Sequence, residues 1–159
     1  MQTRRFAIRS PPDENEAERA VAGLIETYRQ GFLQLNPGQI ASIWDPQHEP
    51  LIYVAQEMKE PTYGWSAIQR YMAALPEHVE QVFAKEIEDL KIDVLGETAI
   101  AFFISHSRVK LKARAELHEP TFRVSMIFTR TAAGWRVIHF HESSLSAQAA
   151  HAMSSARRS

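Results

Sequence analysis

Hydrophobic and polar positions divide the chain into a helical first half and a strand-rich second half. Apolar residues recur three and four positions apart over residues 14–35, 37–44 and 65–75, which predicts three helices, each with one buried stripe. Asp13 is expected to cap the first helix, while Pro37 and Pro76 limit the first and the third. From about residue 82 the spacing changes to the two-residue period of β-strands.

Long strands are predicted over most of the second half. They cover roughly residues 82–95, 98–113, 120–130 and 135–144, and shorter strands are expected at 51–55 and within 57–63. Residues 114–119 form a polar connection. Helices followed by a long antiparallel meander predict an α+β fold, and strand twist curls such a sheet into a cone. We expect the three helices to pack on the concave face, with a pocket in the mouth of the cone.

The last predicted strand, GWRVIHFHESS at 134–144, carries large apolar groups on both faces. With regular alternation, one face presents Arg136, Ile138, Phe140 and Glu142, and the other presents Trp135, Val137, His139, His141 and Ser143. Both faces of the sheet therefore need a cover. We expect the helices to cover one face and a second copy of the chain to cover the other, so the predicted partner is the chain itself, as a homodimer or a larger assembly.

Length and composition fit one domain. The chain has 159 residues, of which 45% are hydrophobic and 23% are charged, and this is enough to bury a core. We expect the domain at 13–145, with a flexible arm at 1–12 and a disordered or weakly helical tail at 146–159.

Charge and residue usage exclude several classes of function. The net charge of -1 gives no reason to expect a nucleic-acid partner, and the absence of cysteine excludes disulfides and thiolate chemistry. No apolar run is long enough to span a membrane and no signal peptide is evident, so we expect no membrane partner and a cytoplasmic location. No phosphate-binding loop or dinucleotide fingerprint is present, and we expect no cofactor.

The order of elements resembles the nuclear transport factor 2-like superfamily, in its SnoaL-like branch, over roughly residues 14–145. The matching motifs are Ile43-Trp44-Asp45 at the end of the second helix and Tyr63-Gly64-Trp65 before the third. The run GWRVIHFHESS is also similar to the last strand of the calmodulin-dependent protein kinase II association domain. The resemblance implies the cone-shaped fold, but the superfamily includes isomerases, dehydratases, epoxide hydrolases, cyclases, transport adaptors and oligomerisation modules.

The chain departs from the steroid isomerases of this superfamily, which use a tyrosine, a protonated acid and a carboxylate base. That trio is not evident here. Tyr28 fits the buried stripe of the first helix, and Asp45 precedes a proline, where it suits a cap or a turn. Glu142 is the acid that stands out on the apolar strands.

Histidines and an arginine on the strands are the candidates for catalysis: His139, His141, His106 and Arg123. His139 and His141 are candidates for a proton shuttle or a ligand anchor, and an H-x-H pair also suits a metal, with His106 as the third ligand. The kinase association domain carries the same pair without being a metalloenzyme, so a hydrogen-bonded structural role is favoured and no metal site is predicted.

A ligand in the pocket is expected to meet Trp44, Tyr53, Trp65, Arg123, Ser125 and His139. The aromatic side chains suit a mostly apolar pocket wall, and Arg123 suits a carboxylate or another anion. The sequence does not set the register between the last two strands, so it leaves open whether Arg123 shares a face with His139 or with Phe140.

Three functions are compatible with these residues. The first is a homodimeric domain that binds a small, partly apolar molecule in the cone, with an anionic group on that molecule left open. The second is an enzyme of the isomerase, cyclase or dehydratase type, in which histidine and arginine side chains carry out acid–base chemistry. The third is an oligomerisation module without catalysis.

Overall fold

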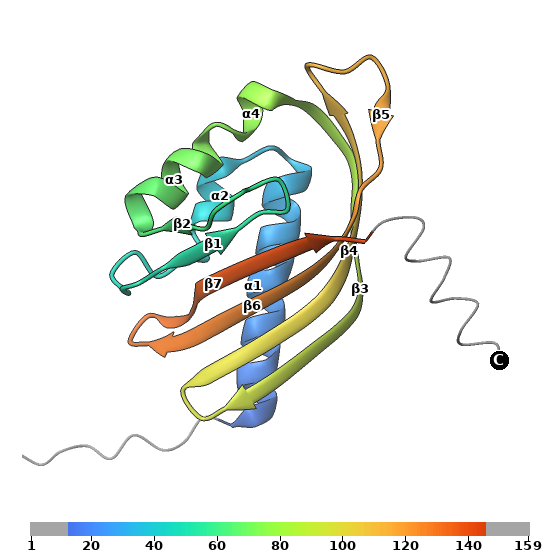
Figure 1. The fold of residues 1–159 in the computed structure, drawn as a ribbon. Helices are drawn as coiled ribbons and strands as arrows, with labels where there is room; N and C mark the ends of the chain where they lie inside the picture. Colours follow the sequence, from blue (N-terminus) through green and yellow to red (C-terminus); the bar gives the residue numbers. More distant parts are fainter. Residues whose placement is uncertain (1–12, 146–159) are drawn as a thin grey trace, which may run out of the picture.

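The fold is a strongly curved sheet that wraps around one long helix, as the computed structural model of the chain shows for residues 13–145 (Figure 1). Helix α1 (Glu14–Leu33) begins after Asp13, whose carboxylate accepts a hydrogen bond from the backbone N–H of Asn15 at 3.0 Å. Helix α2 (Pro37–Ala41) follows, with the Asn36 side chain as its cap. The predicted arm at 1–12 and tail at 146–159 lie outside the described residues.

The α1–α2 turn brings two backbones into close approach. A Cβ atom added at Gly31 would lie 2.8 Å from Cγ1 of Ile40 and 3.0 Å from its backbone nitrogen. Glycine at this position therefore lets α2 fold back against α1. This places Ile40 in the core and at the wall of the cavity described below.

Strands and short helices complete the domain in chain order: β1 (Ile52–Val54), β2 (Thr62–Tyr63), α3 (Trp65–Ala73), α4 (Leu75–His78), β3 (Val79–Leu95), β4 (Thr98–Leu111), β5 (Leu117–His118), β6 (Thr121–Thr131) and β7 (Gly134–Ser144). The sheet order is β2-β1-β7-β6-β4-β3, and β5 pairs with β4. All pairings are antiparallel except that of β1 with β7. The predicted α+β cone is confirmed, and the helices lie on its concave side (Figure 1).

Two details differ from the sequence-based expectation. The third helix does not simply end at Pro76, because a short helix, α4, begins at Leu75 and carries the proline in its first turn, where a missing N–H costs nothing. The connection at 114–119 contains strand β5, which pairs with the far end of β4. These two segments form the rim of the cone.

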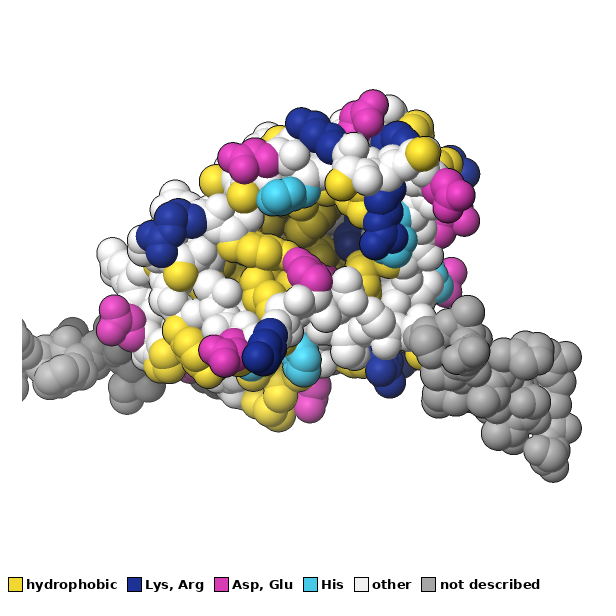
Figure 2. Space-filling view, turned by 45° about the horizontal axis from the view of Figure 1, so that its top comes forward, with side chains coloured by type: hydrophobic (Ala, Val, Ile, Leu, Met, Phe, Trp, Pro, Cys, Tyr) yellow, Lys and Arg dark blue, Asp and Glu magenta, His cyan; other side chains and the backbone are white. Residues whose placement is uncertain are grey.

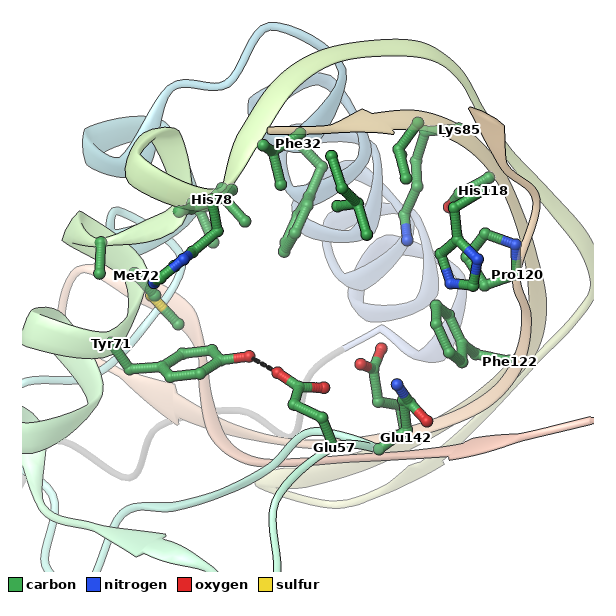
Figure 3. Close-up of a pocket in the computed structure, with 18 of the residues that line it drawn as sticks. Phe32, Glu57, Tyr71, Met72, His78, Lys85, His118, Pro120, Phe122 and Glu142 are labelled. Atoms are coloured by element: carbon green, nitrogen blue, oxygen red, sulfur yellow. Dashed lines mark hydrogen bonds between the residues drawn. The ribbon is translucent and has the colours of Figure 1, made fainter. Parts of the chain in front are cut away.

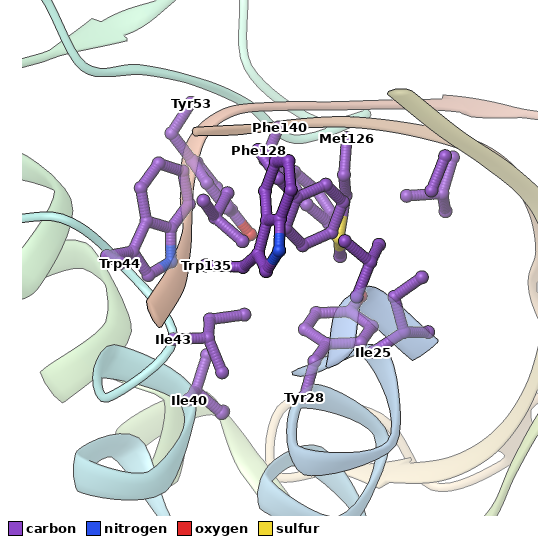
Figure 4. Packing of buried hydrophobic residues seen from close by; sticks show 14 of the residues in the cluster. Ile25, Tyr28, Ile40, Ile43, Trp44, Tyr53, Met126, Phe128, Trp135 and Phe140 are labelled. Atoms are coloured by element: carbon purple, nitrogen blue, oxygen red, sulfur yellow. The ribbon is translucent and has the colours of Figure 1, made fainter. Parts of the chain in front are cut away.

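The core fills the space between α1 and the concave face of the sheet (Figure 4). Tyr28 of α1 packs against Phe103 and Phe140, with ring centroids 6.4 and 5.6 Å away. Phe140 also stacks on Tyr53 of β1 at 4.8 Å. Burying such rings supplies most of the stability of a small domain.

A β-bulge in β7 decides which side chains face this core. Ile127 pairs with His139 and Phe128 pairs with Val137, so Ile138 has no partner on β6. Trp135, Val137 and Phe140 are buried on the concave side. The predicted alternation along 134–144 is therefore wrong beyond Val137: the bulge shifts the period, which turns Phe140 and Glu142 inward and His139, His141 and Ser143 outward.

Candidate functional site

The mouth of the cone contains a cavity of about 510 Å³. Its wall is mostly apolar, and Figure 2 shows it as a deep hollow lined with hydrophobic side chains. The contributing elements are α1, α2, β1 and the segment after it, α3, α4, the hairpin of β4 and β5, and the inner faces of β3, β6 and β7. A volume of this size suits a small organic molecule.

Glu142 is the more buried of the two acids, Glu57 and Glu142, that line this cavity (Figure 3). It pairs in register with the fully buried Val124 of β6, so its side chain points to the concave side. Burial raises the pKa of the Glu142 carboxyl to about 7, the negative charge of Glu57 adds to this effect, and the Lys85 ammonium and the backbone of Gln56 oppose it. Near neutral pH the group therefore exists in both forms, as a general acid–base catalyst requires.

Lys85 reaches the same cavity from β3 (Figure 3). The residue is 5% exposed, and its Nζ atom lies 5.4, 5.1 and 5.9 Å from the ring centroids of Tyr28, Phe32 and Phe122. Arg29 of α1 donates a hydrogen bond to the backbone oxygen of Lys85 at 3.1 Å, which fixes this stretch of β3 against the helix. Burial lowers the pKa of the Lys85 ammonium to about 8, although the charge of Glu142 raises it.

Lys85 and Glu142 form no ion pair with each other or with another group among residues 13–145. Both side chains nevertheless face the same hollow from different strands, β3 and β7 (Figure 3). A buried charge without an oppositely charged partner is costly. The arrangement thus leaves a donor and an acceptor available to a bound molecule.

A second carboxylate lies at the mouth. Tyr71 of α3 donates a hydrogen bond to Glu57, and its ring packs against Tyr53 with centroids 5.1 Å apart (Figure 3). Burial and the neighbouring Glu57 carboxylate raise the pKa of the Tyr71 hydroxyl, so it stays protonated and acts as a donor. His78, Arg114 and His118 line the rest of the mouth from α4, the β4–β5 connection and β5.

Of the aromatic residues predicted for the pocket wall, the structure places Tyr53 there. Trp44 lies in the core instead, where it pairs with Val137 in an isolated bridge and packs against Tyr53 at 6.0 Å. Trp65 is half-buried at the start of α3 and packs against the core cluster rather than the cavity.

The polar candidates on β6 and β7 lie on the convex face, away from the cavity. Arg123 pairs with Ser143 and Ser125 pairs with His141, so all of them point outward with His139. Arg123 is exposed and donates a hydrogen bond to the backbone oxygen of Ser144 at 3.4 Å. Partial burial and the charge of His141 lower the pKa of the His139 imidazole. These residues are therefore brought together, but not at the cavity, because the bulge at Ile138 reversed the predicted faces.

His106 also lies outside the cavity. It shares the outer face of β4 with Phe102 and Ile104. Its ring nitrogens contact Thr121 Oγ1 at 3.0 Å and Glu88 Oε2 at 3.2 Å. These contacts are those of a hydrogen-bonded histidine at the polar margin of a strand.

Within residues 13–145, no group of three or more histidine, aspartate or glutamate side chains is placed to hold a metal ion. Over the same described range, no helix combines the length and the hydrophobicity that crossing a membrane requires.

Glu142 stands out in the sequence as an acid on an apolar strand, but its role is not evident there, and Lys85 is not evident in the sequence as a site residue. The sequence gives only a weak indication that Lys85 faces inward. It lies three residues after the buried Val82, on a strand whose other charged residues are all exposed. A shift in register between Val82 and Ala84 turns Lys85 inward, and a sequence pattern alone does not reveal it.

Comparison with protein families gives a match over most of the chain: a model described as a SnoaL-like domain covers residues 21–147. No curated protein matches the chain.

Solved structures show the same fold at low sequence identity. A proposed dehydratase of the NTF2-like family from Streptomyces avermitilis has a TM-score of 0.74 at 16% identity, over 85% of this chain and 100% of that one. A proposed scytalone dehydratase from Novosphingobium aromaticivorans has a TM-score of 0.73 at 9% identity, over 84% of this chain and 87% of that one. A proposed calcium/calmodulin dependent protein kinase II association domain from Xanthomonas campestris has a TM-score of 0.67 at 16% identity, over 92% of this chain and 99% of that one.

Proposed function

The chain belongs to the SnoaL-like domain family, and from that premise we propose that its cavity binds a small, largely apolar carbonyl compound from which Glu142 removes a proton. The observation that carries this proposal is the placement of Glu142 and Lys85 on the wall of one apolar cavity. Removal of a proton next to a carbonyl group begins both isomerisation and dehydration. Two of the structures that share the fold are described as proposed dehydratases.

Each charged group has a distinct role in this reaction. In its carboxylate form, Glu142 accepts the proton from the carbon beside the carbonyl group. The negative charge that develops on the carbonyl oxygen is stabilised by the ammonium of Lys85, whose interaction is strengthened by the apolar surroundings. Tyr71, held by Glu57, offers a further hydroxyl at the mouth.

A bicyclic ketone, 2-tetralone, is a suitable first probe because it is apolar, small and acidic next to its carbonyl group. We expect the protein to speed the exchange of these hydrogens for deuterium in D₂O, followed by proton NMR. Glu142→Gln should slow the exchange by ~100-fold or more, since it removes the base. Glu60→Gln is the matched control, because Glu60 is exposed and does not line the cavity.

Two results would contradict the proposal. One is exchange by the wild-type protein at the rate of buffer alone. The other is equal loss of exchange in the Glu142 and Glu60 variants, which would attribute the effect to general surface charge. Circular dichroism of both variants verifies that the fold is retained.

We also infer that two copies of the chain associate through the convex face of the sheet. Ile100 and Phe102 of β4 are 41% and 40% exposed there, and strand β6 runs beside them in the sheet. Adjacent apolar side chains on a sheet favour burial against a partner. A homodimer covers them and leaves the cavity on the concave side open.

A further inference from the structure

Lys85 has the surroundings of a nucleophilic amine. Aromatic rings of Tyr28, Phe32 and Phe122 surround its Nζ atom, at 5.4, 5.1 and 5.9 Å. Among residues 13–145, no oxygen accepts a hydrogen bond from this nitrogen, and no carboxylate forms an ion pair with it. The side chain nevertheless reaches the cavity wall, so the nitrogen is accessible to a bound molecule (Figure 3).

We propose that the Lys85 amine forms a Schiff base with a ketone or aldehyde bound in this cavity. Lysine in an apolar pocket is deprotonated more readily than on the surface, because burial disfavours the charged form. The lowered pKa of Lys85, to about 8, agrees with this, since it leaves roughly a tenth of the side chain as free amine at pH 7. The proposal rests on the proposed function, because it assumes the same carbonyl compound in the same cavity.

The reaction balances with the groups present. The nitrogen lone pair forms a bond to the carbonyl carbon, and the π electrons move to the oxygen, which takes a proton from the Glu142 carboxyl. The nitrogen loses a proton to the hydroxyl group, the carbon–oxygen bond breaks, and one water leaves. The products are a protonated imine on Lys85, water and the Glu142 carboxylate. No oxidant or reductant is needed.

Glu142 is suited to both halves of this sequence. Its pKa of about 7 makes the protonated form available for imine formation and the carboxylate available afterwards. The protonated imine withdraws electrons from the neighbouring carbon–hydrogen bond more strongly than a ketone does. The carboxylate then removes that proton, and an enamine forms on Lys85. In this route covalent attachment replaces the electrostatic role that the proposed function gives to the Lys85 ammonium, because the carbonyl oxygen has left as water.

Reductive trapping tests the inference directly. The full-length protein is incubated with 2-tetralone and sodium cyanoborohydride, which reduces an imine to a stable amine. We expect mass spectrometry to find one molecule of ketone less its oxygen attached per chain, and peptide mapping to place it on Lys85. Lys91→Met, which alters an exposed lysine of the same strand, should leave the adduct unchanged. Lys85→Arg should abolish it, and Glu142→Gln should slow it by ~10-fold or more.

The outcomes separate this inference from the proposed function. No adduct in the wild-type protein, or adducts spread over the exposed lysines, overturns the Schiff base whether or not the variants fold. If Lys85→Arg then keeps the deuterium exchange that Glu142→Gln loses, Lys85 acts through its charge alone and the proposed function stands. If the wild-type protein forms the adduct on Lys85 but Glu142→Gln exchanges deuterium normally, the Schiff base stands and the base is misassigned.

Discussion

The concave and convex faces of the curved sheet differ in how their polar side chains are surrounded. On the concave face of β7, Glu142 projects into an apolar cavity and its pKa rises to about 7. On the convex face of the same strand, His141 is exposed. The two residues are adjacent in sequence. The surroundings of a polar side chain on this strand therefore depend on the face that the bulge assigns to it.

The largest difference between the two faces is expected for the stability effect of two neighbouring phenylalanines of β4. Phe103 is fully buried on the concave face, whereas Phe102 is 40% exposed on the convex face. We expect Phe103→Ala to lower the free energy of unfolding by about 3–5 kcal/mol, through lost burial and a cavity, in urea titrations. Phe102→Ala should cost less than about 1 kcal/mol at high dilution. Equal losses at both positions would show that the faces are not distinguished as described.

The charge of Glu142 gives a second test, through pH. The folded protein holds a proton on Glu142 up to about pH 7, while the unfolded chain releases it near pH 4.5. Stability contributed by this proton is complete below pH 4.5 and is lost as the pH rises to 7. Glu142→Gln should therefore raise the free energy of unfolding by about 1–3 kcal/mol at pH 8, and by little at pH 4. Part of the gain is offset because Lys85 loses its attraction to Glu142.

Denaturant titrations at the two pH values, with Glu60→Gln as the exposed control, measure this difference. A gain of the same size at pH 4 and pH 8 would contradict a raised pKa for Glu142.

Association through the convex face predicts an effect on assembly without one on the cavity. Ile100→Glu places a charge on the outer face of β4. We expect the dimer to weaken by ~10-fold or more in sedimentation velocity, because the charge loses its hydration at the contact. Exchange of 2-tetralone should continue. A wild-type protein that is monomeric at every concentration would remove the basis of this prediction.

The smallest effect is expected at the outward histidines. His139→Asn and His141→Asn should change the deuterium exchange by less than about twofold, because both side chains point away from the cavity. A loss as large as that of Glu142→Gln would place the chemistry on the convex face and give the histidines the catalytic role that the sequence left open.

The fold was largely predictable because periodicity, caps and turns agree with one another. Asp13 and Asn36 cap the helices as the sequence indicates, and the four long strands appear within a few residues of their predicted bounds. The site was less predictable, since it depends on local irregularities. Ile138 is the extra residue of a bulge that reverses the faces of β7.

The aromatic residues expected at the pocket wall were also only partly predictable from the sequence. Tyr53 was expected at the wall and lines the cavity from β1, which pairs with β7. Trp44 was expected at the wall but is buried in the core, where it pairs with Val137. Composition indicates an apolar interior. Packing among elements distant in the sequence decides which apolar side chains fill the core and which line the cavity.

Titration of the Glu142 carboxyl is the most direct test of this account. Carbon NMR of the labelled protein, with Glu142→Gln to assign the signal, follows the protonation of that side chain. We predict a midpoint near pH 7, because the group is buried in the cavity. A midpoint near 4.5, the ordinary value of a solvated glutamate, would contradict the claim that Glu142 is the acid–base group of this molecule.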